Sequence, residues 1–367
     1  FPPARILSLL ALPAVAGLAL LGGSSRSSSQ EAPAYVGANT CGICHPTQLS
    51  VQSLSAHAHS ISPAAEHPLA GAFAPVEELI RPPRYHYQFQ RDGNELRVRI
   101  SDPKESVEVP LDWAFGAGEQ AVTFVSRLNE DWYLEHYFSY YAATGKLGPT
   151  PGHMGMRSNT LELAMGLQYR SLDPAVGILQ CFQCHSTAPP IVGHENSIRP
   201  AELGVRCEAC HGPGSLHVQA VSGGDMAKVR AQILNPRRMS ASDLNQLCGR
   251  CHRAPIGGPE VDFRNAWNVR HQPIYLSRSD CFLKSKGSLS CLTCHDAHAK
   301  LDHDLAHYDA KCASCHSAAK HPAAAGYQRG SATGCSQCHM PRVAAQENLQ
   351  FTNHWIGVYG EQKLQPR

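Results

Sequence analysis

Apolar and polar residues alternate along one stretch of the chain, with the period of two that half-buried β-strands show. The alternation runs over residues 85–89 and returns over residues 96–100. Asp92-Gly93 stands between the two runs and is a strong short-range signal for a β-hairpin. The pattern predicts a small β-rich insertion over residues 84–150. It either packs on the rest of the chain or forms a module that docks a partner or shapes a substrate site.

The N-terminal segment has a different pattern. Residues 6–21 form an apolar run after Arg5, and small and polar residues follow up to Gln30. This order is typical of a secretory signal, so residues 1–34 are predicted to be a signal peptide. A retained membrane anchor over residues 6–21 is the alternative, because the run is slightly long for a signal core and short for a membrane span. We expect the mature protein outside the cytoplasm, in a bacterial periplasm or beyond.

The composition excludes several classes of protein. The chain has 367 residues, of which 43% are hydrophobic and 17% charged, so it is not intrinsically disordered. Lys and Arg number 32 against 30 Asp and Glu, and this net charge of +2 argues against nucleic acid as a partner. The unusual counts are those of the 15 cysteines and 21 histidines.

Fourteen of the cysteines belong to seven copies of one motif, Cys-x-x-Cys-His. The cysteines are Cys41/Cys44, Cys181/Cys184, Cys207/Cys210, Cys248/Cys251, Cys291/Cys294, Cys312/Cys315 and Cys335/Cys338. Cys-x-x-Cys alone is compatible with zinc or a redox dithiol, but the trailing histidine is the signature of c-type haem attachment. Seven covalently attached haems c are therefore predicted.

The spacing has a chemical reason. Two thiols three residues apart can form thioethers with the two vinyl groups of one porphyrin, and the adjacent imidazole then binds the iron as proximal ligand. The predicted proximal ligands are His45, His185, His211, His252, His295, His316 and His339. Zinc ribbons do not need a trailing histidine, and seven units cannot pair evenly.

The motifs are unevenly distributed. One falls in residues 35–83, and the other six lie between Cys181 and His339. The polypeptide between Cys181 and His339 is too short to enclose six macrocycles in an ordinary core. The haems themselves are therefore expected to form the core. The predicted fold is mainly α, haem-cored and rich in long loops. Its domains are a first haem segment over 35–83, the β-rich insertion over 84–150 and a six-haem cluster over 151–367.

Several segments resemble a known family. The segments that are similar to multihaem cytochromes c are residues 208–217, 279–282 and 291–298, Cys338-His339-Met340-Pro341 and Thr352-Asn353-His354. The relatives in question are the tetrahaem cytochrome of ammonia oxidisers and, more distantly, hydroxylamine oxidoreductase. The resemblance implies a mainly helical, haem-wrapped fold, bis-histidine irons and electron transfer.

Fourteen histidines outside the motifs are available for seven distal positions. His217 and His298 follow their own proximal ligands too closely to reach the other face of the same ring, so each is expected to bind a neighbouring iron. The predicted distal ligands are His57, His153, His217, His298, His321 and His354. His194 or His271 would be the seventh, with His59 competing with His57 and with His303 and His307 in reserve.

Sulfur ligands stay open as alternatives. Met154 and Met156 flank a favoured histidine, and Cys281 is the cysteine outside the motifs. Cys281 is interpreted as a buried thiol, with contact to a haem or ligation of an iron as alternatives. Gly116–Ala121 fits a dinucleotide-binding pattern but lacks the strand–helix–strand context, so we reject that interpretation.

Two functions are compatible with these residues. The favoured one is an electron carrier that relays electrons between extracytoplasmic redox partner proteins through closely packed bis-histidine haems. The alternative is an oxidoreductase acting on a small nitrogen or sulfur compound at one open haem. No Cys-x-x-Cys-Lys motif marks such a haem, so an enzyme is the less favoured interpretation. Membrane association through residues 6–21 and oligomer formation stay open.

Overall fold

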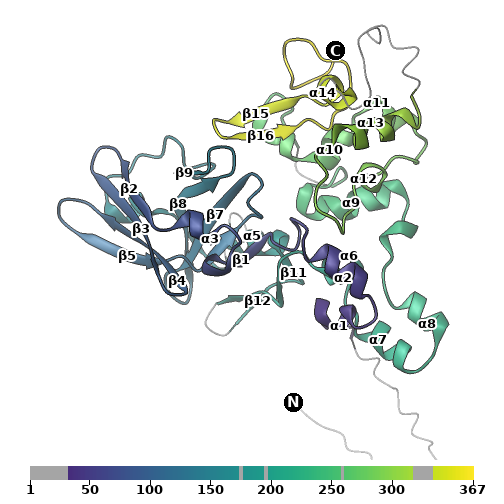
Figure 1. The fold of residues 1–367 in the computed structure, drawn as a ribbon, viewed down its shortest axis with the longest axis horizontal. Coiled ribbons are helices and arrows are strands. Elements are labelled where there is room, and N and C mark those ends of the chain that lie inside the picture. Colours follow the sequence, from purple (N-terminus) through teal and green to yellow (C-terminus); the bar gives the residue numbers. More distant parts are fainter. Residues whose placement is uncertain (1–31, 173–176, 194–196, 258–259, 317–333) are drawn as a thin grey trace, which may run out of the picture. The chain divides into compact units, whose positions relative to one another are not determined.

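The computed structural model describes residues 32–172, 177–193, 197–257, 260–316 and 334–367 (Figure 1). Residues 6–21 lie outside this part of the chain. None of the helices that the structure describes is long and apolar enough to cross a membrane.

Ten strands form two antiparallel sheets. The strands of the first sheet are β1 (Ile61–Pro63), β6 (Trp113–Phe115), β7 (Ala121–Arg127), β8 (Trp132–Tyr141), β9 (Lys146–Pro149) and β10 (Gly166–Arg170), in the order β1-β6-β7-β8-β10 with β9 also paired to β8. Those of the second sheet are β2 (Val76–Arg81), β3 (Tyr85–Asp92), β4 (Glu95–Ser101) and β5 (Ser106–Pro110), in sequence order.

The hairpin predicted from Asp92-Gly93 is present. β3 and β4 pair in antiparallel register from His86↔Ser101 to Asp92↔Glu95. Gly93 has φ +57°, a conformation that glycine adopts without steric cost. Alternate residues of both strands are buried, as the period-two pattern requires.

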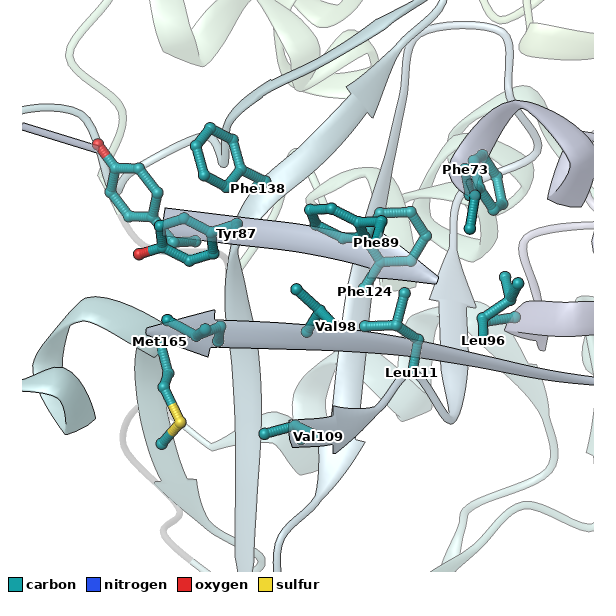
Figure 2. Packing of buried hydrophobic residues seen from close by; sticks show 14 of the residues in the cluster. Phe73, Tyr87, Phe89, Leu96, Val98, Val109, Leu111, Phe124, Phe138 and Met165 are labelled. Carbon is teal, nitrogen blue, oxygen red and sulfur yellow. The ribbon is translucent and has the colours of Figure 1, made fainter. Parts of the chain in front are cut away.

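The two sheets bury a shared hydrophobic core. Phe89 and Val98 of the second sheet and Phe124 and Phe138 of the first belong to one cluster of buried side chains (Figure 2). Phe73, from the short helix α3 (Ala70–Phe73), packs edge-on against Phe124 with ring centres 5.0 Å apart. This core is built from protein side chains and needs no cofactor.

Buried Arg81 fastens helix α4 (Leu161–Met165) to this core. Its guanidinium donates to the backbone oxygens of Met156 at 2.6 Å and Ala164 at 2.9 Å and lies 3.6 Å from the centre of the Tyr137 ring. A buried cation without hydrogen bonds would be costly, and here carbonyl oxygens and an aromatic face satisfy it.

The helices are short. They are α1 (Ala38–Gly42), α2 (Pro46–Gln52), α5 (Ile178–His185), α6 (Cys207–His211), α7 (Ser215–Ser222), α8 (Met226–Ala231), α9 (Ala241–His252), α10 (Gln272–Ser277), α11 (Asp280–Lys284), α12 (Cys291–Cys294), α13 (Leu305–Ala313) and α14 (Cys335–His339). Hairpins β11 (Ser186–Thr187) with β14 (Glu202–Leu203), β12 (Ile191–Val192) with β13 (Ile198–Arg199), and β15 (Arg342–Gln346) with β16 (Leu349–Thr352) lie between and after them.

The mainly α fold expected from the sequence is therefore wrong, and the structure is mixed α/β. Many of the helices are single turns around a Cys-x-x-Cys-His motif. The β region also begins before residue 84 and ends after residue 150, because β1, β2 and β10 join the sheets. β1 and β10 are too short, and β8 too buried on both faces, for alternation to reveal them.

The first sheet positions one of the motifs. Phe182 of α5 is buried, and its ring meets Trp113 at 5.3 Å and Phe115 at 5.0 Å between ring centres, edge to face in both cases. Both aromatic partners lie on β6. Aromatic pairs of this geometry contribute about 1 kcal/mol beyond their buried area. The Cys181–His185 segment is thus anchored on the sheet.

Candidate haem-binding sites

Each Cys-x-x-Cys-His motif forms about one helical turn. The backbone N–H of His45 donates to the carbonyl of Cys41 at 2.9 Å, and that of His295 donates to Cys291 at 3.0 Å. Residues three apart in such a turn share a face, so both thiols of a motif point to the same side. This is the arrangement that two thioether bonds to one porphyrin require.

Backbone carbonyls orient several of the imidazoles. The Nδ1 atom of His185 lies 2.8 Å from the backbone oxygen of Ser60. That of His211 lies 2.8 Å from the backbone oxygen of Leu234, and that of His339 lies 2.9 Å from the backbone oxygen of Gly357. An Nδ1–H that donates to a carbonyl fixes the tautomer and leaves Nε2 as the nitrogen that can bind a metal. Two predicted distal ligands have the same geometry, since His217 donates to Val229 and His354 to Thr352.

The surroundings keep these imidazoles neutral. Burial lowers the pKa of His252 to about 4 and that of His354 to about 4, and nearby histidines lower both further. Burial also lowers the pKa of His185 and of His211. An imidazole must be deprotonated at the binding nitrogen to ligate a metal, so these sites suit ligation.

Three predicted distal histidines face a motif histidine from another part of the chain. The ring centres are 6.2 Å apart for His57 and His252, 6.1 Å for His211 and His298, and 6.3 Å for His295 and His354. These distances lie in the upper part of the range of about 4.5 to 7 Å over which aromatic rings pair.

One metal ion between the two rings of each pair would also be compatible with this spacing. A metal–imidazole nitrogen bond is about 2 Å long, and the ring centre lies about 1 Å behind that nitrogen, so two imidazoles on opposite sides of one iron have centres about 6 Å apart. The residues present therefore fit haem c, which the two thiols of a motif would hold covalently and the two imidazoles of a pair would bind at the iron. A bound haem c would supply a one-electron Fe(III)/Fe(II) couple.

Cysteines of different motifs lie side by side. Thiols of different motifs lie close enough to shift each other's pKa in the pairs Cys41 and Cys207, Cys184 and Cys251, and Cys248 and Cys291. Burial also raises the pKa of Cys41 to about 11 and that of Cys312 to about 12. Attachment points this close bring neighbouring haem sites together.

Four of the predicted haem-binding cysteines are exposed rather than enclosed by the polypeptide. Cys44, Cys251, Cys315 and Cys338 are exposed, whereas the other ten cysteines of the motifs are half-buried. Each of the four is the second cysteine of its motif, and the sequence did not predict this difference. The thiol of Cys315 accepts a long contact of 3.8 Å from the hydroxyl of neighbouring Ser314. Protein side chains do not bury Cys44 and Cys315. The polypeptide therefore does not form an enclosed core around these two predicted attachment points. Their attachment to haem stays a prediction.

Buried Glu208, inside the Cys207 motif, joins two motif segments. Its carboxylate accepts hydrogen bonds from the backbone N–H of Val36 at 3.0 Å, Gly37 at 2.8 Å and Gly214 at 2.7 Å. Val36 and Gly37 precede the Cys41 motif. Glu208 is 2% exposed, so these three donors take the place of water around the carboxylate. Nothing in the sequence pattern marks this role.

Two further polar residues join consecutive motifs in an equivalent way. Asn245 lies three residues before Cys248, and its Oδ1 accepts from the backbone N–H of Cys291 at 3.1 Å. Asp309 lies three residues before Cys312, and its Oδ1 accepts from the backbone N–H of Cys335 at 2.8 Å. A polar residue three positions before the first cysteine is a signal that sequence reading could have used.

Other predicted ligands have different surroundings. His153 is fully buried in the β region, with Nε2 3.1 Å from Oε2 of Glu135, and is not brought opposite a motif histidine. His217 has the carbonyl of Val229 as the partner of its Nδ1, 2.8 Å away. His194 and His321 lie outside the described residues. Their ligand roles stay predictions.

The remaining candidates are scattered. His271 is buried, and its Nδ1 has no hydrogen-bond partner among the described residues. His303 lies 3.8 Å from Glu119 and His307 lies 3.4 Å from Asp302, each facing a carboxylate. Met154 is 52% exposed. Cys281 is only half-buried rather than fully so, and its pKa is raised by burial.

Comparison with known proteins gives a partial match. The family model described as cytochrome c554 and c-prime matches residues 157–212, which include the Cys181 and Cys207 motifs. The multiheme cytochrome MtrA of Shewanella baltica (strain OS185) is 25% identical over 182 residues, which are 45% of this chain and 46% of that protein. The chain thus spans less than half the length of this curated relative.

A solved structure is loosely similar. The crystal structure of outer cell wall cytochrome OcwA superposes with a TM-score of 0.46 at 14% identity, covering 88% of this chain and 79% of that one. The family match and the MtrA match agree with the repeated attachment motif. The chain is similar to multihaem cytochromes c, and this similarity implies covalently bound haem c as its cofactor.

Proposed function

We propose that the chain binds seven haems c and relays electrons between redox partner proteins outside the cytoplasm. The three imidazole pairs carry the proposal. Two imidazoles on one iron fill both axial positions and leave none for a substrate. Such sites favour electron transfer over catalysis.

The same reasoning extends to the other motifs. His153, His217 and His321 are proposed as distal ligands of further irons, and His194 or His271 as the seventh. The adjacent cysteines of different motifs support short distances between haem edges, which electron transfer requires. The chain's own part is to hold each imidazole neutral and oriented, through carbonyl acceptors such as those of Ser60 and Leu234.

The location and partners follow from the sequence. Haem attachment to Cys-x-x-Cys-His belongs outside the cytoplasm, and residues 1–34 have the order of a signal peptide. Partners are proposed to be redox proteins rather than nucleic acids, because the net charge is only +2. The division into segments 35–83, 84–150 and 151–367 is kept as a proposal for the domains, although strands β1, β2 and β10 extend the two sheets beyond residues 84–150.

The test uses the purified, haem-loaded protein. A pyridine haemochrome assay should give seven haems per chain, and the ferric spectrum should be low-spin throughout. Cyanide, nitrite or hydroxylamine should leave the Soret band unchanged. If one haem binds nitrite stoichiometrically and the reduced protein consumes nitrite catalytically, the oxidoreductase alternative replaces the electron carrier.

A further inference from the structure

Ser279 lies at the start of helix α11 and is fully buried. It occupies the N-cap position, where a serine hydroxyl ordinarily accepts a hydrogen bond from the first turn of its own helix. Over α11, which the structure describes along its whole length, no such side-chain bond forms. A residue that departs from its local preference in this way is expected to serve another part of the structure.

The hydroxyl of Ser279 binds the backbone just after strand β16. It donates to the carbonyl of His354 at 3.0 Å and accepts from the N–H of Ile356 at 2.7 Å. The donor and the acceptor capacity of one hydroxyl are thus used on the two sides of Trp355. Because Ser279 is fully buried, water cannot replace either bond without a cost in free energy.

This segment presents one proposed iron ligand. The ring of His354 faces that of His295, in the Cys291 motif, at 6.3 Å between ring centres. Its Nδ1 donates to the carbonyl of Thr352 at 2.9 Å, which leaves Nε2 for the metal. The position of His354 opposite the Cys291 motif therefore depends on the backbone that Ser279 holds.

The same segment orients a second proposed ligand. Gly357 exchanges two hydrogen bonds with His339, the proximal histidine of the Cys335 motif. Nδ1 of His339 donates to the Gly357 carbonyl at 2.9 Å, and the N–H of Gly357 donates to the His339 carbonyl at 3.1 Å. Gly357 directly follows Ile356, whose N–H donates to the Ser279 hydroxyl. One hydroxyl therefore holds the backbone that serves both histidines.

Asn353 limits the freedom of this segment from its other side. It is fully buried, and its Oδ1 accepts from the N–H of Trp355 at 2.9 Å. Its Nδ2 donates to the carbonyls of Lys363 at 2.9 Å and Leu364 at 3.0 Å. Residues 354–357 are therefore held from both sides, so a shift at one end of the segment is passed to the other.

We propose that Ser279 is a positioning residue that couples two haem sites, those of the Cys291 and Cys335 motifs, by holding residues 354–357 in one arrangement. The first site is reached through its distal imidazole and the second through the carbonyl that orients its proximal imidazole. The inference rests on the proposed function, since it takes both imidazoles as iron ligands. An imidazole whose Nδ1–H donates to a carbonyl is a more basic ligand and favours Fe(III), so this backbone also sets the potentials of both haems.

The test compares the haem-loaded wild type with Ser279→Ala. The substitution removes the acceptor of the Ile356 N–H and the donor to the His354 carbonyl, so the segment should relax and both imidazoles should donate less well. In ferric electron paramagnetic resonance, two low-spin signals should move together, one of them being the signal that is lost in His354→Ala. Spectroelectrochemical titration should show both midpoint potentials raised, because a less basic ligand favours Fe(III) less.

Two further variants make the result specific. Ser277→Ala is the matched control, because that hydroxyl donates to the carbonyl of Ile274 within helix α10 at 2.7 Å, and it should change neither signals nor midpoints. Gly357→Ala acts from the other end, because the added Cβ would lie 2.5 Å from Cβ of Pro366 and must displace the segment. It should move the same two signals, and it decides the matter if Ser279→Ala fails to fold.

Wild-type signals and midpoints in Ser279→Ala or Gly357→Ala, with full haem content, overturn the coupling. A change confined to one of the two signals also overturns it, because the two sites would then respond separately. Failure of the proposed function has a different result. His354→Ala would then keep every low-spin signal of the wild type, which would show that His354 binds no iron.

Discussion

His298 lies opposite His211, with ring centres 6.1 Å apart and ring planes inclined by only 13°, although its neighbour in sequence is the motif histidine His295. His295 in turn faces His354. The short tether between His295 and His298 prevents both from reaching one iron from opposite sides. In these two pairs a motif histidine faces an imidazole from another part of the chain, so His298 and His354 each connect two segments that carry motifs.

The first prediction concerns this crossing. His298→Ala should keep all haems attached, because the thioethers are untouched, but convert one low-spin iron to high spin. Electron paramagnetic resonance of the ferric protein measures the change. His303→Ala is the control, since that exposed ring faces Glu119 at 3.8 Å and should leave the spectrum as in the wild type. A low-spin spectrum in His298→Ala would rule out ligation by His298.

How much of this could be predicted from the sequence depends on the range of the interaction. The hairpin over residues 85–101 is local, and the alternation with Asp92-Gly93 was enough. The attachment motifs are local too. The pairing of His57 with His252 was out of reach, because nothing near either residue specifies which distant ring it will face. The exposure of Cys44 and Cys315 was out of reach for the same reason, since it depends on which distant segments pack beside each motif.

The error in fold class has a physical cause as well. The resemblance and the motif density suggested helices, but a motif needs only one turn of helix, as α12 (Cys291–Cys294) shows. The β region is held by its own core around Phe89 and Phe124. Short edge strands such as β1 (Ile61–Pro63) leave too few residues for a period to be read.

The second prediction concerns Glu208. Glu208→Ala leaves the buried N–H groups of Val36, Gly37 and Gly214 without their acceptor, at a cost of about 3 kcal/mol. The thermal unfolding midpoint should fall by several degrees, and proteolysis near Tyr35 should become faster. Glu78→Ala is the control, because this exposed carboxylate pairs with exposed His86. Equal melting of both variants would mean that Glu208 does not hold the segment.

The third prediction concerns acid stability. Burial lowers the pKa of His136 to about 3 from 6.5, and its Nε2 lies 2.6 Å from the hydroxyl of Ser126. Between these two pKa values the unfolded chain binds a proton that the folded chain does not. Stability from this residue is therefore present above pH 6.5 and lost as the pH falls toward 3, by up to about 1.4 kcal/mol per pH unit.

The comparison with His136→Asn isolates this contribution. Urea unfolding followed by circular dichroism at about pH 7 and about pH 5 should show a larger loss of stability for the wild type than for the variant. The other buried histidines titrate in both proteins, so their effect cancels in the difference. Parallel losses would contradict a neutral, buried His136.

The last prediction concerns Asn245, which joins helix α9 to the Cys291 motif. Its Oδ1 accepts from the backbone N–H of Cys291 at 3.1 Å, as Asp309 does for Cys335 at 2.8 Å. Asn245→Ala leaves the start of α12 without this acceptor, and we expect a loss of about 1 to 2 kcal/mol. Asn245→Asp keeps the acceptor and copies the residue found at the equivalent position.

A comparison of the two variants separates the contribution of the hydrogen bond to stability from that of the side-chain volume. Asn245→Ala should unfold at lower temperature and be isolated with less haem on Cys291 and Cys294, measured by peptide mass. Asn245→Asp should lose less stability than Asn245→Ala, because the buried carboxylate retains the N–H of Cys291 as donor. If Asn245→Asp is the less stable of the two, burial of the added charge outweighs the bond, and the equivalence with Asp309 fails.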